Sequence, residues 1–270
     1  MLTLMYITNN PHVARIAEAN GVDRIFVDLE TIGKQERQGG LDTVQSHHTL
    51  EDIAIIRTVF NGELLVRSNP IHNDSPYEIR KIIENGADIV MLPYFKTVDE
   101  VEKFVKFVDG KAKVNLLVET AEAVEVLDDI LKLDGINEIH IGLNDLHLSY
   151  HKKFMFELLI DGTVENISRK VLAKGIKLGI GGIASVGQGK LPAEYIIKEH
   201  YRIGSTCAIL SRAFCNTDQL LDNLEIERQF KEGMSKIRSL EKEIQSNEQC
   251  DFFENNRIEL ANKINEIIYQ

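Results

Sequence analysis

Cysteine is scarce in this sequence, and the few cysteines form no metal-binding or disulfide pattern. Cys207, Cys215 and Cys250 are odd in number, and none is joined to another by Cys-x-x-Cys spacing. Neither a disulfide framework nor a thiolate metal site is therefore indicated. The expected location is a reducing one, the cytoplasm.

The sequence also has fewer basic than acidic residues and no long apolar run. Lys and Arg number 31 against 42 Asp and Glu, which gives a formal net charge of −11. Proteins that bind nucleic acids usually present a basic face, so we expect a small-molecule substrate and no nucleic-acid partner. If that substrate is an acid, its site needs local positive charge from arginine or a metal ion. No basic leader and no apolar run of about 18 residues is found, which predicts neither export nor a membrane partner.

Short β-branched runs alternate with helical segments from the first residues to about residue 215. The predicted strands are 2–8, 24–29, 63–68, 88–93, 113–119, 138–143, 177–183 and 205–211. The predicted helices between them are 12–20, 49–60, 76–86, 97–108, 120–133, 161–175 and 192–201. Eight parallel strands can close into a barrel, whereas an open doubly wound sheet usually has about five or six. We therefore predict an α/β fold, a (β/α)8 TIM barrel, as the catalytic domain over residues 1–216.

The strand pattern stops after this domain, and two charged helical segments follow, at 217–247 and 251–270. In the first, apolar residues recur at steps of three and four: Phe230, Met234, Ile237, Leu240 and Ile244. Such spacing places them on one face of a helix. We therefore predict a C-terminal helical extension, residues 217–270, which packs on the barrel or on a neighbouring subunit.

Catalytic residues of α/β barrels lie at the carboxyl ends of the strands. In this sequence these ends carry Asp28 and Glu30, Arg67, Glu119 and Asp145. Acids and an arginine that meet at one mouth suit a divalent cation and an anionic substrate. Because Mg²⁺ often takes only one or two protein carboxylates, Glu119 and Asp145 could be its ligands. Each could instead form a salt bridge or cap the helix that follows its strand.

Three runs of this chain carry a family resemblance: GADIVMLPYFKTVDEVEKFVKFV, LLVETAEAVEVLDDIL and INEIHIGLNDLHLS. Over about residues 5–215 the chain resembles the HpcH/HpaI aldolase and citrate lyase β-chain superfamily, whose members are pyruvate-type TIM barrels. The resemblance implies that Glu119 and Asp145 bind a divalent metal, Mg²⁺ or Mn²⁺. It also implies that the backbone amides around Asn144 and Asp145 hold the carboxylate of the substrate.

Two further motifs agree with this resemblance. VRSNP resembles the arginine motif of the family's third strand, which makes Arg67 the residue that grips a carboxylate or enolate oxygen. FVDLE resembles the acidic motif of the second strand, whose residues Asp28 and Glu30 would orient water or the catalytic base. In GIGGIA, Gly182 either lets substrate approach the main chain or marks a crowded barrel rim, since the full nucleotide-binding fingerprints are absent. Arg212 could bind an anion or form a salt bridge.

Three positions depart from the family pattern. Simple pyruvate aldolases of the family carry a histidine base after the acidic pair, where this chain has Thr31. Leu117 replaces their glutamine before the metal glutamate, which favours the citrate lyase branch. That branch often has a lysine after the proline of the fourth strand, where this chain has Tyr94. The chain therefore fits neither branch completely.

The departure at position 31 leaves the catalytic base open. The lengthened segment 31–49 holds Lys34, Arg37 and two histidines that could contact substrate at the mouth. His48, or its neighbour His47, could supply the base, although both could equally be solvated histidines at a helix start. His72, His147 and His151 could also reach the mouth from loops.

These residues together predict one chemistry. Removal of a proton beside a carbonyl creates an enolate, and a cation and an arginine stabilise its negative oxygen. We therefore predict a divalent-metal-dependent carbon–carbon lyase, aldolase or citrate-lyase-like, that acts through an enolate of pyruvate, another 2-oxo acid or a carboxylated acyl thioester. A phosphoenolpyruvate-type mutase or hydrolase and a non-catalytic metabolite-binding barrel are the alternatives. A homo-oligomer is expected because family members often assemble.

Overall fold

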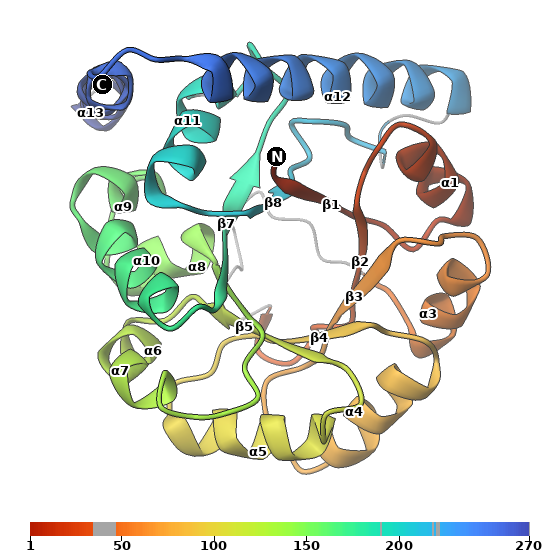
Figure 1. The fold of residues 1–270 in the computed structure, drawn as a ribbon. Helices are drawn as coiled ribbons and strands as arrows, with labels where there is room; N and C mark the ends of the chain where they lie inside the picture. The colour runs from red at the N-terminus through yellow and green to blue at the C-terminus, as the bar shows by residue number, and fades with distance from the viewer. Residues whose placement is uncertain (35–46, 190, 218, 220–221, 270) are drawn as a thin grey trace.

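The computed structural model describes residues 1–34, 47–189, 191–217, 219 and 222–269. Within these ranges, eight parallel strands close into a barrel in sequence order, and helices surround it (Figure 1). The strands are β1 (Thr3–Ile7), β2 (Arg24–Asp28), β3 (Glu63–Arg67), β4 (Ile89–Leu92), β5 (Lys113–Val118), β6 (Glu138–Ile141), β7 (Lys177–Ile183) and β8 (Cys207–Leu210). The predicted (β/α)8 barrel is confirmed, and each strand lies within its predicted range.

The helices also follow the predicted order, with two differences. They are α1 (Pro11–Ala19), α3 (Leu50–Arg57), α4 (Ser75–Glu84), α5 (Val98–Val108), α6 (Ala121–Glu125), α7 (Leu127–Ile130), α8 (Leu143–Ser149), α9 (Glu157–Ile160), α10 (Thr163–Ala173), α11 (Ala193–Ile203), α12 (Asn223–Ser246) and α13 (Phe252–Tyr269). The single helix predicted over 120–133 is broken into α6 and α7. The segment after β6, expected to be a loop, forms α8 and α9.

Local sequence signals set several of these boundaries. Thr97 precedes α5, where its hydroxyl accepts the N–H of Glu100 at 3.3 Å and the Glu100 carboxylate accepts the N–H of Thr97 at 2.9 Å. This reciprocal pair satisfies two N–H groups that the first helical turn leaves open. Gly86 and Gly175 follow α4 and α10 with φ values of 104° and 70°, which only glycine adopts readily. The predicted ends of these helices are confirmed.

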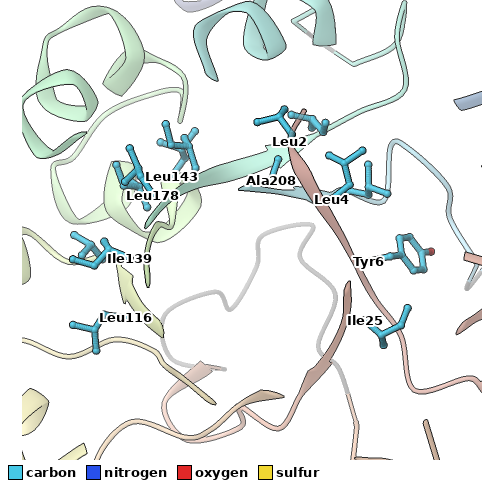
Figure 2. Packing of buried hydrophobic residues seen from close by; sticks show 14 of the residues in the cluster. Leu2, Leu4, Tyr6, Ile25, Leu116, Ile139, Leu143, Leu178 and Ala208 are labelled. Carbon is cyan, nitrogen blue, oxygen red and sulfur yellow. The ribbon is translucent and has the colours of Figure 1, made fainter. Parts of the chain in front are cut away.

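The strand residues divide between two cores. One set faces the surrounding helices, and Figure 2 shows Tyr6, Leu116 and Ile139 from this set pointing away from the centre of the barrel. The alternate residues fill the barrel interior: Met5, Phe26, Leu65, Ile89, Met91, Leu117 and Cys207. Successive strand side chains point to opposite faces. The residues two positions beyond Phe26, Leu65 and Leu117 therefore also face the barrel axis, at its mouth.

The C-terminal helix α12 lies along the outside of the barrel beside α1 and α11 (Figure 1). The predicted apolar stripe faces inward, since Phe230, Met234, Ile237 and Ile244 are buried. Polar contacts reinforce this packing: Glu241 Oε1 accepts the N–H of Leu2 at 2.6 Å. Helix α13 packs against α11 and α9. None of the helices in the described ranges is long and apolar enough to cross a membrane.

Candidate active site

Four charged side chains form a buried network at the carboxyl ends of β2 and β3, which we call the acid–arginine cluster (Asp28, Glu30, Lys34 and Arg67). Arg67 donates from Nε to Asp28 Oδ1 and from Nη2 to Asp28 Oδ2, both at 2.8 Å. Its Nη1 lies 3.2 Å from Glu30 Oε2. Lys34 Nζ donates to Asp28 Oδ2 at 2.8 Å and lies 4.0 Å from Glu30 Oε2. The structure thus brings three predicted site residues together and adds Lys34 to them.

Asp28 is the centre of this cluster. Burial alone would raise the pKa of Asp28, but the charges of Arg67 and Lys34 and their hydrogen bonds hold it well below its usual value. Asp28 is therefore an ionised anchor for both cations. Arg67 also lies over the Phe26 ring, with its Cζ atom 5.5 Å from the ring centroid. These contacts fix the guanidinium at the mouth of the barrel.

Glu119 is a buried carboxylate directly after β5, only 2% exposed. Its Oε1 accepts the N–H of Tyr94 at 2.9 Å. Gly142 makes room for it, because a Cβ atom at position 142 would lie 2.9 Å from both the Cβ and the Oε2 of Glu119. Burial, and then the negative charges of Asp145 and Glu30, raise the pKa of Glu119 well above its usual value. A bound cation would reverse both effects.

Asn144 and Asp145 lie in the first turn of α8, which begins after Gly142. The first N–H groups of a helix have no partner within the helix and point out of its end. Leu143 and Leu146 are buried and hold α8 against the barrel. The negative charge of Asp145 acts on Glu119, so α8 brings this carboxylate to the buried acid. The expectation that Asp145 stands in a loop is wrong, and the cause is this burial of two leucines.

His48 lies beside the acid–arginine cluster, whereas its neighbour His47 is exposed. The Nδ1 atom of His48 accepts the backbone N–H of Asp28 at 2.9 Å. A neutral imidazole carries one proton, so this contact assigns the proton of a neutral His48 to Nε2. In this arrangement the ring is suited to donate a proton from Nε2. Arg37, the other predicted contact of this segment, lies outside the described residues.

Three other histidines contact or lie within nearby helices and strands. His72 Nδ1 lies 2.9 Å from the hydroxyl of Ser75 at the start of α4. His147 is in α8 and not in a loop, with its Nδ1 3.2 Å from the carbonyl oxygen of Leu143. His140 is 1% exposed inside β6, where burial lowers its pKa to about 4. These contacts give no support to a catalytic role for the three histidines.

Gly182 lies on β7, where the pairing with β8 is irregular between Gly179 and Gly182. It is half-buried and pairs with Ile209. Strand β6 separates it from the strand that carries Glu119. Gly182 therefore belongs to the mouth but to a different part of its wall from the acid–arginine cluster. Arg212, just beyond β8, is exposed.

Comparison with known proteins decides the family. The profile of the HpcH/HpaI aldolase/citrate lyase family matches residues 2–186, more than half of the chain. The chain belongs to this family. A comparison with curated proteins found no match.

Solved structures of HpcH/HpaI proteins share the fold at low sequence identity. An aldolase from Desulfitobacterium hafniense DCB-2 is 16% identical with a TM-score of 0.60, covering 78% of this chain and 86% of its own. An aldolase/citrate lyase family protein from Burkholderia cenocepacia J2315 is 14% identical with a TM-score of 0.58, covering 78% and 88%. The citrate synthase SbnG is 17% identical with a TM-score of 0.59, covering 89% and 94%. Family membership supports a lyase-type activity for this chain.

HpcH/HpaI proteins are generally dependent on a divalent metal, so the fit of the residues to a metal matters. Among the described residues, no three His, Cys, Asp or Glu side chains are grouped as a metal cage. Mg²⁺ and Mn²⁺ prefer oxygen ligands, and Mg²⁺ commonly takes one or two carboxylates while waters or substrate complete its shell. Buried Glu119 beside Asp145 fits this donor set.

Three features of this HpcH/HpaI site were missed in the sequence. Lys34 was foreseen only as a contact in a loop, not as a buried partner of Asp28. Tyr94 was noted as a departure from the family, whereas its backbone N–H binds Glu119. Gly142, inside the predicted strand 138–143, was not singled out, although a glycine within a strand can mark a close approach of another group. The contacts of Tyr94 and Gly142 with Glu119 join segments distant in sequence, and that of Lys34 depends on how a loop folds back on its own strand.

Proposed function

We propose that this chain is a divalent-metal-dependent carbon–carbon lyase, of the aldolase or citrate lyase type, that acts through an enolate. The enolate would derive from pyruvate, another 2-oxo acid or a carboxylated acyl thioester. The observation that carries this proposal is buried Glu119, whose pKa is raised by burial and by the negative charges of Asp145 and Glu30, at a mouth that also holds Arg67. Such acids are stable together when a cation lies among them.

Glu119 and Asp145 would hold Mg²⁺ or Mn²⁺. When bound, this ion supplies Lewis-acid polarisation of the carbonyl beside the reacting carbon. The raised pKa of Glu119 supports the assignment, since burial and nearby negative charge disfavour its ionised form until a cation is near. The N–H of Tyr94 donates to Glu119 Oε1 and keeps the carboxylate of Glu119 in one orientation.

Arg67 would stabilise the negative oxygen of the enolate. Its hydrogen bonds to Asp28 use the N–H of Nε and one N–H of Nη2, and its Nη1 lies 3.2 Å from Glu30 Oε2. A guanidinium has five N–H groups, so Nη1 and Nη2 each have a second one that could donate to a substrate oxygen. Because two nitrogens of Arg67 donate hydrogen bonds to Asp28, the orientation of the guanidinium plane is fixed before the substrate binds.

The remaining predicted residues would bind the substrate and its enolate. The backbone N–H groups of Asn144 and Asp145, in the first turn of α8, would hold the substrate carboxylate. Gly182 would let the substrate approach the main chain of β7. His48 Nε2, which carries the proton of the neutral ring while Nδ1 accepts the N–H of Asp28, would donate a hydrogen bond to the negative oxygen of the enolate.

The structural relatives bear on the direction of the reaction. Two are described as aldolases or aldolase/citrate lyase proteins, and one as a citrate synthase. Cleavage leaves an enolate that must be protonated, whereas synthesis forms an enolate that attacks a second carbonyl. Both directions share the first intermediate, so formation of the enolate of pyruvate is the step to test.

The test is exchange of the methyl protons of pyruvate with heavy water, followed by NMR. We expect exchange with Mg²⁺ or Mn²⁺ and none with a chelator, and a loss of at least about 100-fold in Glu119→Gln and Asp145→Asn. Glu122→Gln is the matched control, because Glu122 is an exposed acid three positions further along that pairs with Lys96. Metal-independent exchange, or full exchange in Glu119→Gln, would contradict the proposal.

A further inference from the structure

A second site lies at the same end of the barrel, outside the acid–arginine cluster. It is a pocket of about 390 Å³ between the loop after β7, the loop after β8 and helix α12. The proposed catalytic residues stand on or after β2, β3, β5 and β6, so the pocket occupies a different sector of the mouth. Its lining begins at Ser185, at the limit of the family match, and the rest lies beyond residue 186. This pocket is therefore built largely by the part of the chain that the family profile does not match.

The floor of the pocket is rigidly packed. Phe214 and Cys215, from the loop after β8, are 3% and 1% exposed. Phe214 stands edge-on to Phe230 of α12, with ring centroids 5.4 Å apart. Gly233 permits this approach, because a Cβ atom there would lie 2.6 Å from the Phe214 ring. Glycine weakens a helix interior, so its presence in the middle of α12 indicates that the close contact is needed.

Hydrogen bonds from two other strands secure the same loop. Tyr6 of β1 donates its hydroxyl proton to the carbonyl oxygen of Cys215 at 2.9 Å. The hydroxyl of Ser185, just after β7, donates to the carbonyl oxygen of Phe214 at 3.0 Å. Three parts of the fold thus hold the loop in place. A pocket wall fixed in this way requires little ordering when a ligand binds.

The rim of the pocket is cationic in an acidic protein. Among the described residues, its lining includes Arg212, Arg228 and Lys236 and a single carboxylate, Glu232. Arg228 also contacts Glu225 at 2.7 Å and Glu232 at 3.6 Å, so its charge is partly offset. Four side-chain amides complete the polar lining: Gln188, Asn216, Gln219 and Gln229. Against a net charge of −11, such a local excess of cations favours an anionic ligand.

We propose that this pocket binds a phosphate ester of a small polyhydroxy compound. Guanidinium and ammonium groups are the side chains that bind phosphate oxygens, and amides both donate to and accept from hydroxyl groups. The volume is within the range of small-molecule sites, roughly 300–1,000 Å³, and larger than a phosphate ion needs. Barrels of this class frequently bind phosphate at the loops after strands seven and eight. The inference goes beyond the proposed lyase activity and does not depend on it.

Calorimetric titration of the full chain tests the proposal, with D-ribose 5-phosphate, D-ribose and inorganic phosphate as probes. We expect the ester to bind at least about tenfold more tightly than either ribose or inorganic phosphate, and inorganic phosphate to compete with it. Lys236→Gln and Arg228→Gln should each weaken binding of the ester about tenfold, the usual effect of losing one charge-assisted hydrogen bond. Lys231→Gln is the matched control, since Lys231 is exposed on the same helix but does not line the pocket.

Glu119→Gln separates this site from the proposed metal site, and binding of the ester should survive that substitution unchanged. Loss of binding in Glu119→Gln would place the phosphate at the proposed metal site and overturn the inference. Equal binding of ribose and ribose 5-phosphate would overturn it, as would equal losses in Lys231→Gln and Lys236→Gln. Binding of inorganic phosphate as tight as that of the ester would overturn the assignment of an ester. Thermal melting of each variant verifies that the substitutions leave the fold intact.

Discussion

At the scale of single residues, Tyr94 shows how one backbone conformation positions Glu119, the proposed metal ligand. Its φ angle is 47°, in the left-handed region that residues other than glycine rarely adopt. In this conformation its N–H is 2.9 Å from Glu119 Oε1. Strain of this kind, on the order of 1 kcal/mol, persists where surrounding contacts enforce it, often at functional sites.

Substitutions at position 94 should separate the strain from the hydrogen bond. Tyr94→Gly keeps the N–H and accepts the positive φ, so we expect stability within about 1 kcal/mol of the parent and retained Mn²⁺ affinity. Tyr94→Pro removes the N–H and cannot adopt this φ, and should cost about 3 kcal/mol and weaken Mn²⁺ binding. Urea unfolding measures the stability of each variant, and titration measures its affinity for Mn²⁺. Equal Mn²⁺ affinity in the two variants would show that the N–H of Tyr94 does not position Glu119.

The sequence predicts the residues of the site better than their contacts. Three residues could be found because each stands at or directly after the end of a buried strand, two positions beyond a residue that faces the barrel interior: Asp28, Arg67 and Glu119. Lys34 could not be placed beside Asp28, because nothing in the sequence fixes how a loop folds back on the strand that it follows. The partner of His48 could not be predicted either, because it is the backbone N–H of Asp28, and a sequence does not show which backbone groups a side chain contacts.

At the scale of elements, α12 depends on a glycine that helix propensity disfavours. Gly233→Ala would ordinarily stabilise an exposed helix by about 1 kcal/mol. Here the added Cβ atom would lie 2.6 Å from the Phe214 ring, so we expect a loss of about 1–3 kcal/mol instead. Ser239→Ala, at an exposed position of the same helix, is the control and should be neutral or slightly stabilising. A more stable Gly233→Ala protein would show that Phe214 does not pack closely on α12.

The elements that sequence reasoning missed are short ones held by tertiary contacts. The segment LNDLHLS contains Asn, Asp and Ser, which favour caps and turns, and its seven residues are too few for an independent helix. It forms α8 because Leu143 and Leu146 are buried. By contrast, α5 has eleven residues and its own capping pair, so local signals alone were sufficient to predict it.

At the scale of the whole molecule, a buried ion pair joins strands across the amino-terminal end of the barrel. Arg24 donates to both oxygens of Glu138 at 2.7 and 2.8 Å, and its Nη2 lies 2.7 Å from Glu63. Arg24 and Glu138 are 3% and 4% exposed. Burial opposes ionisation of Glu138, yet the hydrogen bond and charge of Arg24 lower its pKa below the usual 4.5.

Arg24→Met should therefore destabilise the fold by about 3–5 kcal/mol at pH 7, because it leaves the buried carboxylate of Glu138 without the positive charge of Arg24. Since the pKa of Glu138 is lowered in the folded state, the stability from this pair is complete above pH 4.5 and is lost as pH falls below it. The difference in urea stability between parent and variant should shrink in that acidic range. Lys103→Met, which breaks an exposed pair with Asp99, should cost less than about 1 kcal/mol. Similar losses in the two variants at pH 7 would contradict this account.

The assembly of the molecule is also open to direct measurement. We propose a homo-oligomer, as the family resemblance implied, with the C-terminal helices α12 and α13 as candidates for the contact. Sedimentation equilibrium should give a mass that is a multiple of 30.6 kDa. A single 30.6 kDa species at micromolar concentration would contradict the proposal.

The central claim is that Glu119 and Asp145 hold a divalent metal, and titration with Mn²⁺ followed by electron paramagnetic resonance tests it most directly. The parent and Glu122→Gln should bind one ion per chain, whereas Glu119→Gln and Asp145→Asn should lose at least about 100-fold in affinity. Affinity should also rise with pH, because the pKa of Glu119 is raised and its proton must leave before the metal binds. Unchanged affinity in Glu119→Gln, or no binding by the parent, would contradict the account.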